Sequence, residues 1–318
     1  MTVSIIIAAK TWQKSLEECV GRCLELDFSD YEIIILPDYH IERELDGHIR
    51  VVPTGPITPP QKRDISIEHA RGEILAFIDD DAYPRADWLK NALENFKDDA
   101  VAAVGGPAVT PSGDTLRQRA SGNIYSSFLV SGQYVYRYLP RERLELDDYP
   151  TCNLLVRKSI MQALGGFNTH FWPGEDTKLC LDITKRLGKK IIYDPDVLVY
   201  HHRRPIFLPH LKQVASYALH RGYFVRRYPD TSLKISYFIP SIFLLFLFTG
   251  AILSFFLSPI RAVYLAILSC YALLVFIFNI FQETLLIFLV FFGTILTHLT
   301  YGFYFLIGLF TKKLKEEL

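Results

Sequence analysis

The sequence predicts an α/β protein with a doubly wound, mostly parallel sheet, followed by C-terminal transmembrane helices. Apolar runs alternate with helix-forming stretches through the N-terminal part, which is the β-α-β pattern of such sheets. Beyond about residue 232, charged residues nearly disappear until the last few positions. The 318 residues suffice for one soluble domain and a membrane segment. We therefore expect a soluble domain at 1–232, a membrane domain at 233–311 and a charged tail at 312–318.

Short apolar runs predict the buried strands of the sheet. The first run begins directly after Met1, without a basic region or a cleavage site, so we expect a strand there and not a signal peptide. The expected strands are Val3–Ala8, Tyr31–Leu36, Ile74–Ile78, Lys190–Tyr193 and Val197–Tyr200.

Helices are expected where apolar residues recur at helical spacing between these strands. In the first of them, Cys19 and Cys23 share one face and behave as small apolar residues. The chain has five cysteines and no CxxC pair, which fits a reducing compartment. The expected helices are Trp12–Leu26, Asp64–Arg71, Asp87–Lys97 and a helix that begins near Glu175 and ends at Gly188.

Three apolar stretches are long enough to cross a bilayer: Ile235–Leu257, Ala262–Phe281 and Thr284–Phe310. Basic residues before the first stretch place the N-terminal domain in the cytoplasm, so that we expect an integral membrane protein with a cytoplasmic catalytic domain. Three crossings would, however, put the basic C-terminal tail on the opposite side. Two alternatives stay open. Either all three helices cross, or only two cross and the last stretch lies partly in the membrane interface, from about His298 onward.

Acidic residues follow two of the expected strands. Asp38 comes after the second strand, and Asp79, Asp80 and Asp81 come directly after Ile74–Ile78. In doubly wound sheets, ligands bind beyond the carboxyl ends of the strands. Adjacent carboxylates repel one another unless a cation or a partner offsets their charge, and Mg²⁺ and Mn²⁺ prefer such oxygens. The alternative is a solvated acidic turn.

Two further clusters carry groups suited to chemistry. Glu175 and Asp176 open a helix, where acids are common as caps, although an Asp can also act as a general base. His201 and His202, followed by two arginines, stand at a strand end and suit a metal–diphosphate site. Arg221 lies before the first apolar stretch, where contact with anionic lipid is the alternative. The formal net charge is zero, which gives no indication of nucleic-acid binding.

The order of these pieces resembles family 2 glycosyltransferases with the GT-A fold, close to the membrane-anchored cellulose-synthase-like and succinoglycan-type enzymes. The resemblance runs from Val3 to about Gly222. Its most specific part is the combination, in this order, of Arg63-Asp64, Ala70-Arg71-Gly72-Glu73, Asp79–Asp81 and Gly174-Glu175-Asp176.

The resemblance implies a role for each matching residue. In a donor site, Ala8 and Ala9 would lie beside the nucleotide, Asp38 would bind the base, Arg63 and Asp64 would hold the nucleotide and its sugar, and Arg221 would bind the diphosphate. Asp79 and Asp81 would be the outer members of the DxD motif, and Asp79 and Asp80 would also belong to the donor site. The metal would be held by Asp81 and by His201 or His202, with Asp79 as a further possible ligand. In the ED motif, Glu175 precedes Asp176, which would be the general base.

The resemblance also implies an activity. We expect an inverting glycosyltransferase that uses Mn²⁺ or Mg²⁺ and a UDP- or GDP-sugar, in polysaccharide biosynthesis at the cell envelope. A general base favours a hydroxyl acceptor on a lipid-linked sugar, glycolipid or polysaccharide, because a phosphate acceptor is largely ionised near neutral pH. The alternatives are a polyprenyl-phosphate glycosyltransferase and a non-catalytic membrane scaffold that retains the nucleotide fold.

Overall fold

The computed structural model describes residues 1–279 and 284–317, and its contacts divide the chain into two compact units. The sheet unit comprises Met1–Pro111 and Tyr136–His202, and the helical unit comprises Ser112–Val135 and Arg203–Leu318. The predicted division into a cytoplasmic domain ending at residue 232 and a membrane domain after it stays a prediction.

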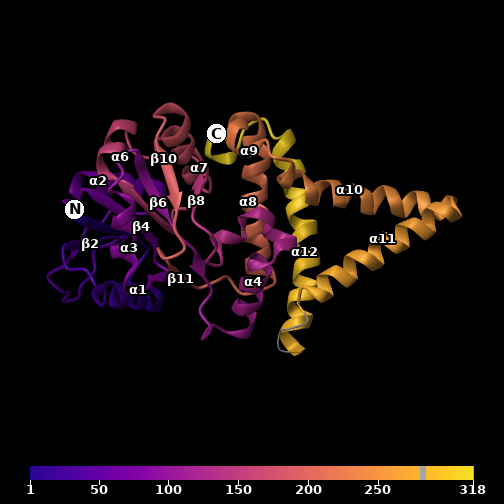
Figure 1. Ribbon diagram of the computed structural model, residues 1–318, viewed down its shortest axis with the longest axis horizontal. Helices are drawn as coiled ribbons and strands as arrows, with labels where there is room; N and C mark the ends of the chain where they lie inside the picture. Colours follow the sequence, from indigo (N-terminus) through magenta and orange to yellow (C-terminus); the bar gives the residue numbers. More distant parts are fainter. Residues whose placement is uncertain (280–283, 318) are drawn as a thin grey trace. The chain divides into compact units, whose positions relative to one another are not determined.

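The sheet unit is built on one eight-stranded sheet (Figure 1). All its strands run in one direction except β9 and β8, each of which pairs only antiparallel. This arrangement confirms the predicted mostly parallel α/β sheet. In spatial order the strands are β3 (Ile49–Val51), β2 (Tyr31–Leu36), β1 (Val3–Ala8), β4 (Ile74–Asp79), β9 (Asn153–Arg157), β6 (Val101–Gly105), β10 (Lys190–Tyr193) and β8 (Leu144–Leu146).

The central strands are continuous apolar runs because both faces of the sheet are covered. In β1 and β4 every apolar residue before the last position of the strand is buried. In the register of the three parallel strands, Ala8 of β1 lies opposite both Leu36 of β2 and Asp79 of β4. The carboxyl ends of β1, β2 and β4 therefore meet at the same edge of the sheet.

Helices cover the sheet between these strands. The first expected helix is confirmed as α1 (Lys14–Leu24), which buries Cys19 and Cys23. The second, α2 (Pro59–His69), begins five residues earlier than expected, because prolines fit the first turn of a helix and Gln61 accepts a hydrogen bond from the backbone of Thr58 at 3.0 Å. The other helices of this unit are α3 (Trp88–Asn95), α6 (Lys158–Leu164) and α7 (Glu175–Leu181), which continues as a π-helical turn (Asp182–Arg186).

A small second sheet lies in the same unit. It consists of β5 (Ala82–Pro84), β11 (Val199–His201) and β7 (Ala108–Val109). The strand expected at Val197–Tyr200 is β11, shifted by two residues at its start, and it pairs antiparallel with β5 and parallel with β7. The chain reversal after β4 leads directly into β5, so this small sheet connects the acidic triplet with residues more than a hundred positions later.

Within its described residues, the helical unit contains three helices that are long and apolar enough to cross a membrane. They are α10 (Ile235–Phe256), α11 (Ser258–Ile277) and α12 (Thr284–Phe310). The second begins four residues earlier than expected, with Pro259 in its first turn, and the expected end of that stretch at Phe281 lies outside the described residues. The other elements of this unit are α4 (Leu116–Ser126), α5 (Phe128–Ser131), α8 (Leu208–Arg227), α9 (Pro229–Ser232) and a 3₁₀ turn (Lys315–Glu317). A further 3₁₀ turn (Gly132–Arg137) includes the chain boundary between the two units.

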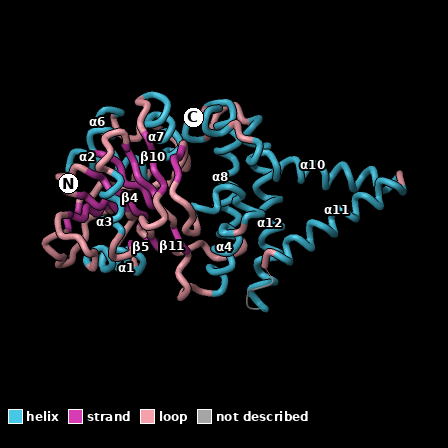
Figure 2. The backbone as a smooth tube through the Cα atoms, in the orientation of Figure 1, coloured by secondary structure: helices cyan, strands magenta, loops and turns pink. Residues whose placement is uncertain are grey.

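Close backbone contact joins α8 to α12 (Figure 2). A Cβ added at Gly222 of α8 would lie 2.1 Å from the carbonyl oxygen of Phe305, and one added at Gly308 of α12 would lie 2.0 Å from that of Leu219. Only glycine permits this approach. The two helices therefore run side by side with their backbones nearly in contact.

Candidate active site

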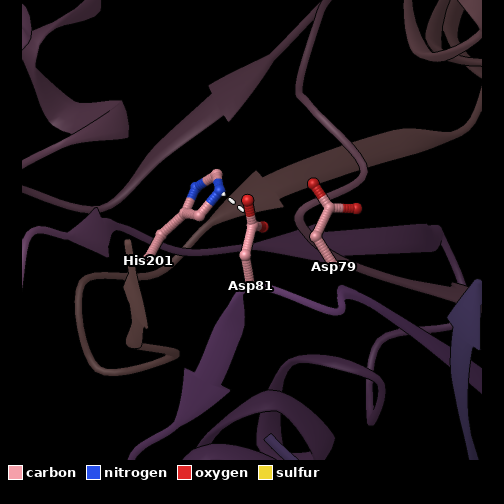
Figure 3. A group of neighbouring side chains, drawn as sticks. All are labelled: Asp79, Asp81 and His201. Atoms are coloured by element: carbon pink, nitrogen blue, oxygen red, sulfur yellow. Dashed lines mark hydrogen bonds and ion pairs between the residues drawn. The ribbon is translucent and has the colours of Figure 1, made fainter. Parts of the chain in front are cut away.

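The acidic triplet and His201 come together through strand pairing. Asp79 is the last residue of β4, and Asp81 immediately precedes β5. In the antiparallel pairing of β5 with β11, Ala82 lies opposite His201. Nε2 of His201 consequently lies 3.0 Å from Oδ1 of Asp81 (Figure 3).

Asp79, Asp81 and His201 form a group that could hold a metal ion. Each residue offers one potential ligand atom, and these three atoms all lie within 4.8 Å of one another. All three residues are half-buried. Figure 3 shows their side chains on the same side of the backbone. Carboxylate oxygens and an imidazole nitrogen are ligands that divalent transition metals accept together.

The two adjacent histidines make different contacts. Successive side chains of a strand point to opposite sides, and His201 is the last residue of β11. Nε2 of His202 lies 3.1 Å from Oε2 of Glu18, in α1, while its backbone N–H donates to the carbonyl oxygen of Asp81 at 2.9 Å. The geometry therefore brings the side chain of His201, and not that of His202, into the group with the two aspartates.

The pKa of Asp80, the middle acid of the triplet, is raised in this cluster of negative charges. Burial, with the neighbouring charges of Asp81 and Asp79 adding to it, raises the pKa of Asp80 to about 6. Nε2 of Gln13 donates to its carboxylate at 2.9 Å and opposes the shift. A bound cation would relieve this repulsion.

Arg63 of α2 connects the triplet to the start of α7. Its guanidinium donates to Asp79 at 2.7 Å and to Glu175 at 2.9 Å, and the side chains of Arg63 and Glu175 are only 5% and 6% exposed. Burial raises the pKa of Glu175, and the charge of Arg63 opposes this rise. For Arg63, burial lowers the pKa, but the charges of Asp79 and Glu175 outweigh burial and raise it. The guanidinium therefore stays charged and fixes two elements against each other.

Asp176 follows Glu175 in the first turn of α7. The turn before the helix uses Gly174 at φ +117°, a conformation that favours glycine. Oδ1 of Asp176 accepts a hydrogen bond from the N–H of Thr177 at 2.7 Å, and a carboxylate at this position is stabilised by the helix dipole. Asp176 is half-buried and close enough to Arg63 to favour that residue's charged form. Its carboxylate can accept a proton from a hydroxyl placed beside it.

A lysine that the sequence analysis missed holds Asp38. Nζ of Lys62 is buried and donates to Oδ1 of Asp38 at 2.5 Å, to the carbonyl of Ala9 at 2.7 Å and to that of Leu36 at 3.2 Å. Hydrophobic periodicity could not predict that Lys62 is buried, because the buried side of α2 consists mainly of polar residues. The available signal was that Pro59–His69 has no continuous apolar face, which indicates a helix packed through polar contacts.

Two predicted donor residues make contacts elsewhere. Asp64 accepts a hydrogen bond from the N–H of Phe167 at 2.8 Å, and burial raises its pKa to about 6. Arg221 belongs to the helical unit, where it donates to Ser232 at 3.2 Å and lies over the ring of Tyr237. The donor contacts expected of both residues stay predictions.

Comparison with known proteins gives consistent matches. A family model described as "Glycosyl transferase family 2" matches residues 4–165. The pre-mycofactocin glycosyltransferase of Mycobacterium tuberculosis is 27% identical over 172 residues, covering 54% of this chain and 36% of that protein. The succinoglycan biosynthesis protein ExoM of Rhizobium meliloti is 32% identical over 104 residues, covering 32% of this chain and 30% of that protein. These matches span about a third of each relative's length.

Two longer matches extend beyond the sheet unit. A Methanococcus voltae protein named dolichyl N-acetyl-alpha-D-glucosaminyl phosphate 3-beta-D-2,3-diacetamido-2,3-dideoxy-beta-D-glucuronosyltransferase is 23% identical over 246 residues, covering 71% of this chain and 74% of that protein. Among solved structures, the mannosyltransferase PcManGT from Pyrobaculum calidifontis, in complex with GDP-Man and Mn²⁺, covers 98% of this chain and 88% of its own. Its TM-score is 0.65 at 18% identity, a likeness that confirms the predicted GT-A fold class.

We predict that Arg63→Met destabilises the protein by about 3–5 kcal/mol, because it leaves the carboxylates of Asp79 and Glu175 without their partner. Thermal unfolding of the purified full chain, followed by tryptophan fluorescence, measures the effect as a fall in Tm. Arg71→Met is the matched control, since Arg71 is exposed and lies two residues beyond the end of the same helix.

A triple variant separates lost charge pairing from lost packing. Adding Asp79→Asn and Glu175→Gln to Arg63→Met removes the unpaired charges, so we expect much of the Tm to return. Equal Tm values for Arg63→Met and the wild-type chain would contradict the structural role assigned to this ion pair.

Proposed function

The chain belongs to glycosyl transferase family 2, and on this premise we propose that it transfers a sugar from a nucleotide-diphosphate sugar to an acceptor at a membrane. The observation that carries the proposal is the cluster of Asp79, Asp81 and His201 at the carboxyl edge of a parallel sheet, joined through Arg63 to the start of α7. That edge is where doubly wound sheets bind their ligands.

In this proposal a divalent cation is held by Asp81 and His201, with Asp79 as a third candidate ligand. When bound, the cation neutralises charge that develops on the departing nucleotide diphosphate. An imidazole ligand favours Mn²⁺ over Mg²⁺, which prefers oxygen ligands in a strict octahedron. The related structure of PcManGT contains Mn²⁺ and GDP-Man, which supports this choice of metal and of a nucleotide-sugar donor.

The nucleotide would lie across the ends of β1 and β2. Ala8 ends the first strand and Ala9 follows it, and the Lys62 ammonium fixes the carboxylate of Asp38 beyond the second strand. A carboxylate held in one position can read the N–H groups of a base. Asp64, Asp80 and Arg221 remain proposed donor contacts.

Asp176 is the proposed general base, and Glu175 acts by holding Arg63. A base on the opposite side of the sugar from the diphosphate takes the proton of an acceptor hydroxyl, and direct displacement then inverts the anomeric centre. The name of the Methanococcus voltae relative describes a dolichyl-phosphate-linked sugar as acceptor, which supports a lipid-linked sugar hydroxyl here. Transfer to a polyprenyl phosphate and a non-catalytic scaffold are the alternatives that the following experiments test.

We predict that Asp81→Asn lowers Mn²⁺-dependent nucleotide release about 100-fold, because it replaces a charged carboxylate ligand of the proposed metal with a neutral amide. The measurement is a screen of UDP- and GDP-sugars with and without Mn²⁺ or Mg²⁺. His201→Ala should reduce release far more than His202→Ala, whose side chain contacts Glu18. Asp99→Asn, at a fully exposed position, is the control.

Two outcomes would contradict this assignment. Equal losses for both histidine variants would remove His201 from the metal site. Absence of release from every donor by the wild-type chain would favour the scaffold.

We predict that Asp176→Asn lowers transfer to a lipid-linked sugar about 100-fold or more while the donor KM changes little, since a general base contributes to the chemical step and not to donor binding. Steady-state kinetics with a polyprenyl-phosphate-linked sugar as acceptor measure this. Near wild-type transfer to a bare polyprenyl phosphate by the same variant would instead establish the phosphate as acceptor.

A further inference from the structure

One face of α12 is covered by other helices along nearly its whole length. Near its start, Leu286 packs with Ile124 of α4. Farther along, Oγ1 of Thr297 lies 2.9 Å from Nε2 of His210, in α8, and toward its end Gly308 meets the α8 backbone. The buried residues of α12 include three glycines, two threonines and His298 beside Leu286, Val290 and Phe305, so its small and polar residues lie on the covered face.

The helices that cover α12 carry charge. In α4 these residues are Arg117 and Arg119, and in α8 they include Lys212, Arg226 and Arg227, which are exposed. Lysine and arginine are strongly disfavoured in the hydrocarbon core of a bilayer. If α12 crossed the membrane, the helices packed along it would have to enter the core with it. The packing therefore argues against a crossing by α12, although its length and composition would permit one.

The opposite face of α12 is a continuous apolar stripe. Its exposed residues recur at spacings of three, four or seven positions, as expected for one side of a helix. They include Leu285, Phe288, Phe292, Leu296, Phe303 and Ile307. A stripe of this size rarely faces water in a soluble protein.

The other two apolar helices form a hairpin that starts and ends on α12 (Figures 1 and 2). Ser241 of α10 donates to the carbonyl of Gly302 at 2.9 Å, and the hydroxyl of Tyr271, in α11, lies 2.8 Å from Nδ1 of His298. The helices have 22 and 20 residues, or about 33 and 30 Å, which matches a hydrocarbon core of about 30 Å. The hairpin can therefore cross the bilayer and return.

We propose that α12 lies along the membrane surface with its apolar stripe against the lipid acyl chains, and that only α10 and α11 cross. The C-terminal segment packs on α8, since Tyr223 donates to Glu317 at 2.6 Å and Arg226 donates to the carbonyl of Thr311. Both ends of the hairpin and the C-terminus then lie on one side. Basic residues gather there, as the positive-inside rule requires: Arg226, Arg227, Lys234, Lys312, Lys313 and Lys315.

Spin-label depth measurements on the full chain in liposomes test this proposal without requiring turnover. In a Cys152→Ser, Cys270→Ala background, single cysteines are placed on α12 (Leu285→Cys, Leu296→Cys, Ile307→Cys) and, for comparison, on α10 (Ile239→Cys, Leu245→Cys, Ile252→Cys). All six positions are exposed. Collision rates with oxygen and with a water-soluble nickel chelate report the depth of each label. We expect one shallow depth for all three α12 labels, whereas the middle label of α10 lies deepest.

A label at position 296 clearly deeper than those at 285 and 307 would overturn the proposal. Labels on α12 that are shielded from both reagents would also overturn it, because they would indicate a protein partner on the stripe.

A second measurement does not depend on labels within helices. In sealed vesicles, a membrane-impermeant maleimide should reach Lys313→Cys and Arg71→Cys from the same side. Labelling from opposite sides would show that α12 crosses.

Discussion

The buried guanidinium of Arg63 organises the sheet unit of this protein. It lies between the carboxylates of Asp79, at the end of β4, and Glu175, at the start of α7. A buried charge must be paired, so α2, β4 and α7 are held in one arrangement. Asp176 and the acidic triplet are thereby fixed relative to each other, which is what a reaction between a metal-bound donor and an activated acceptor would require.

The same edge concentrates negative charge that the protein offsets only in part. Arg63 is shared by two carboxylates, while Asp80 has a pKa raised to about 6 by burial and by its neighbours. His201 is brought next to Asp81 by the pairing of β11 with β5. Stability and proposed function thus oppose each other here, because the repulsion that destabilises the empty cluster is what would favour binding of a divalent cation.

Much of the fold followed from local sequence patterns. Val3–Ala8 and Tyr31–Leu36 were predicted to the residue, because strands buried on both faces are continuous apolar runs. The strands Val101–Gly105 and Asn153–Arg157 were not predicted, since the first is rich in small residues and the second includes polar ones. Their places in the sheet depend on pairing with distant segments.

The sequence was enough to select residues of the candidate site but not to predict their contacts. Acids at a strand end indicated Asp79 and Asp81, and acids at a helix start indicated Asp176. The choice between His201 and His202, however, depends on the pairing of residues 82 and 201. Lys62 was missed because sequence rules place lysine outside, and here three oxygen atoms satisfy its buried ammonium. Likewise, hydropathy alone marks α12 as a candidate membrane span, and only the packing shows that α4 and α8, which carry basic residues, lie along it.

An anomalous-scattering map of crystals grown with Mn²⁺ and UDP or GDP would test the central claim most directly. The account predicts one manganese peak in contact with the carboxylate of Asp81 and the imidazole of His201, with the nucleotide diphosphate bound beside it. A nucleotide bound at this edge of the sheet without manganese between these two side chains, or a manganese peak at another site only, would contradict it.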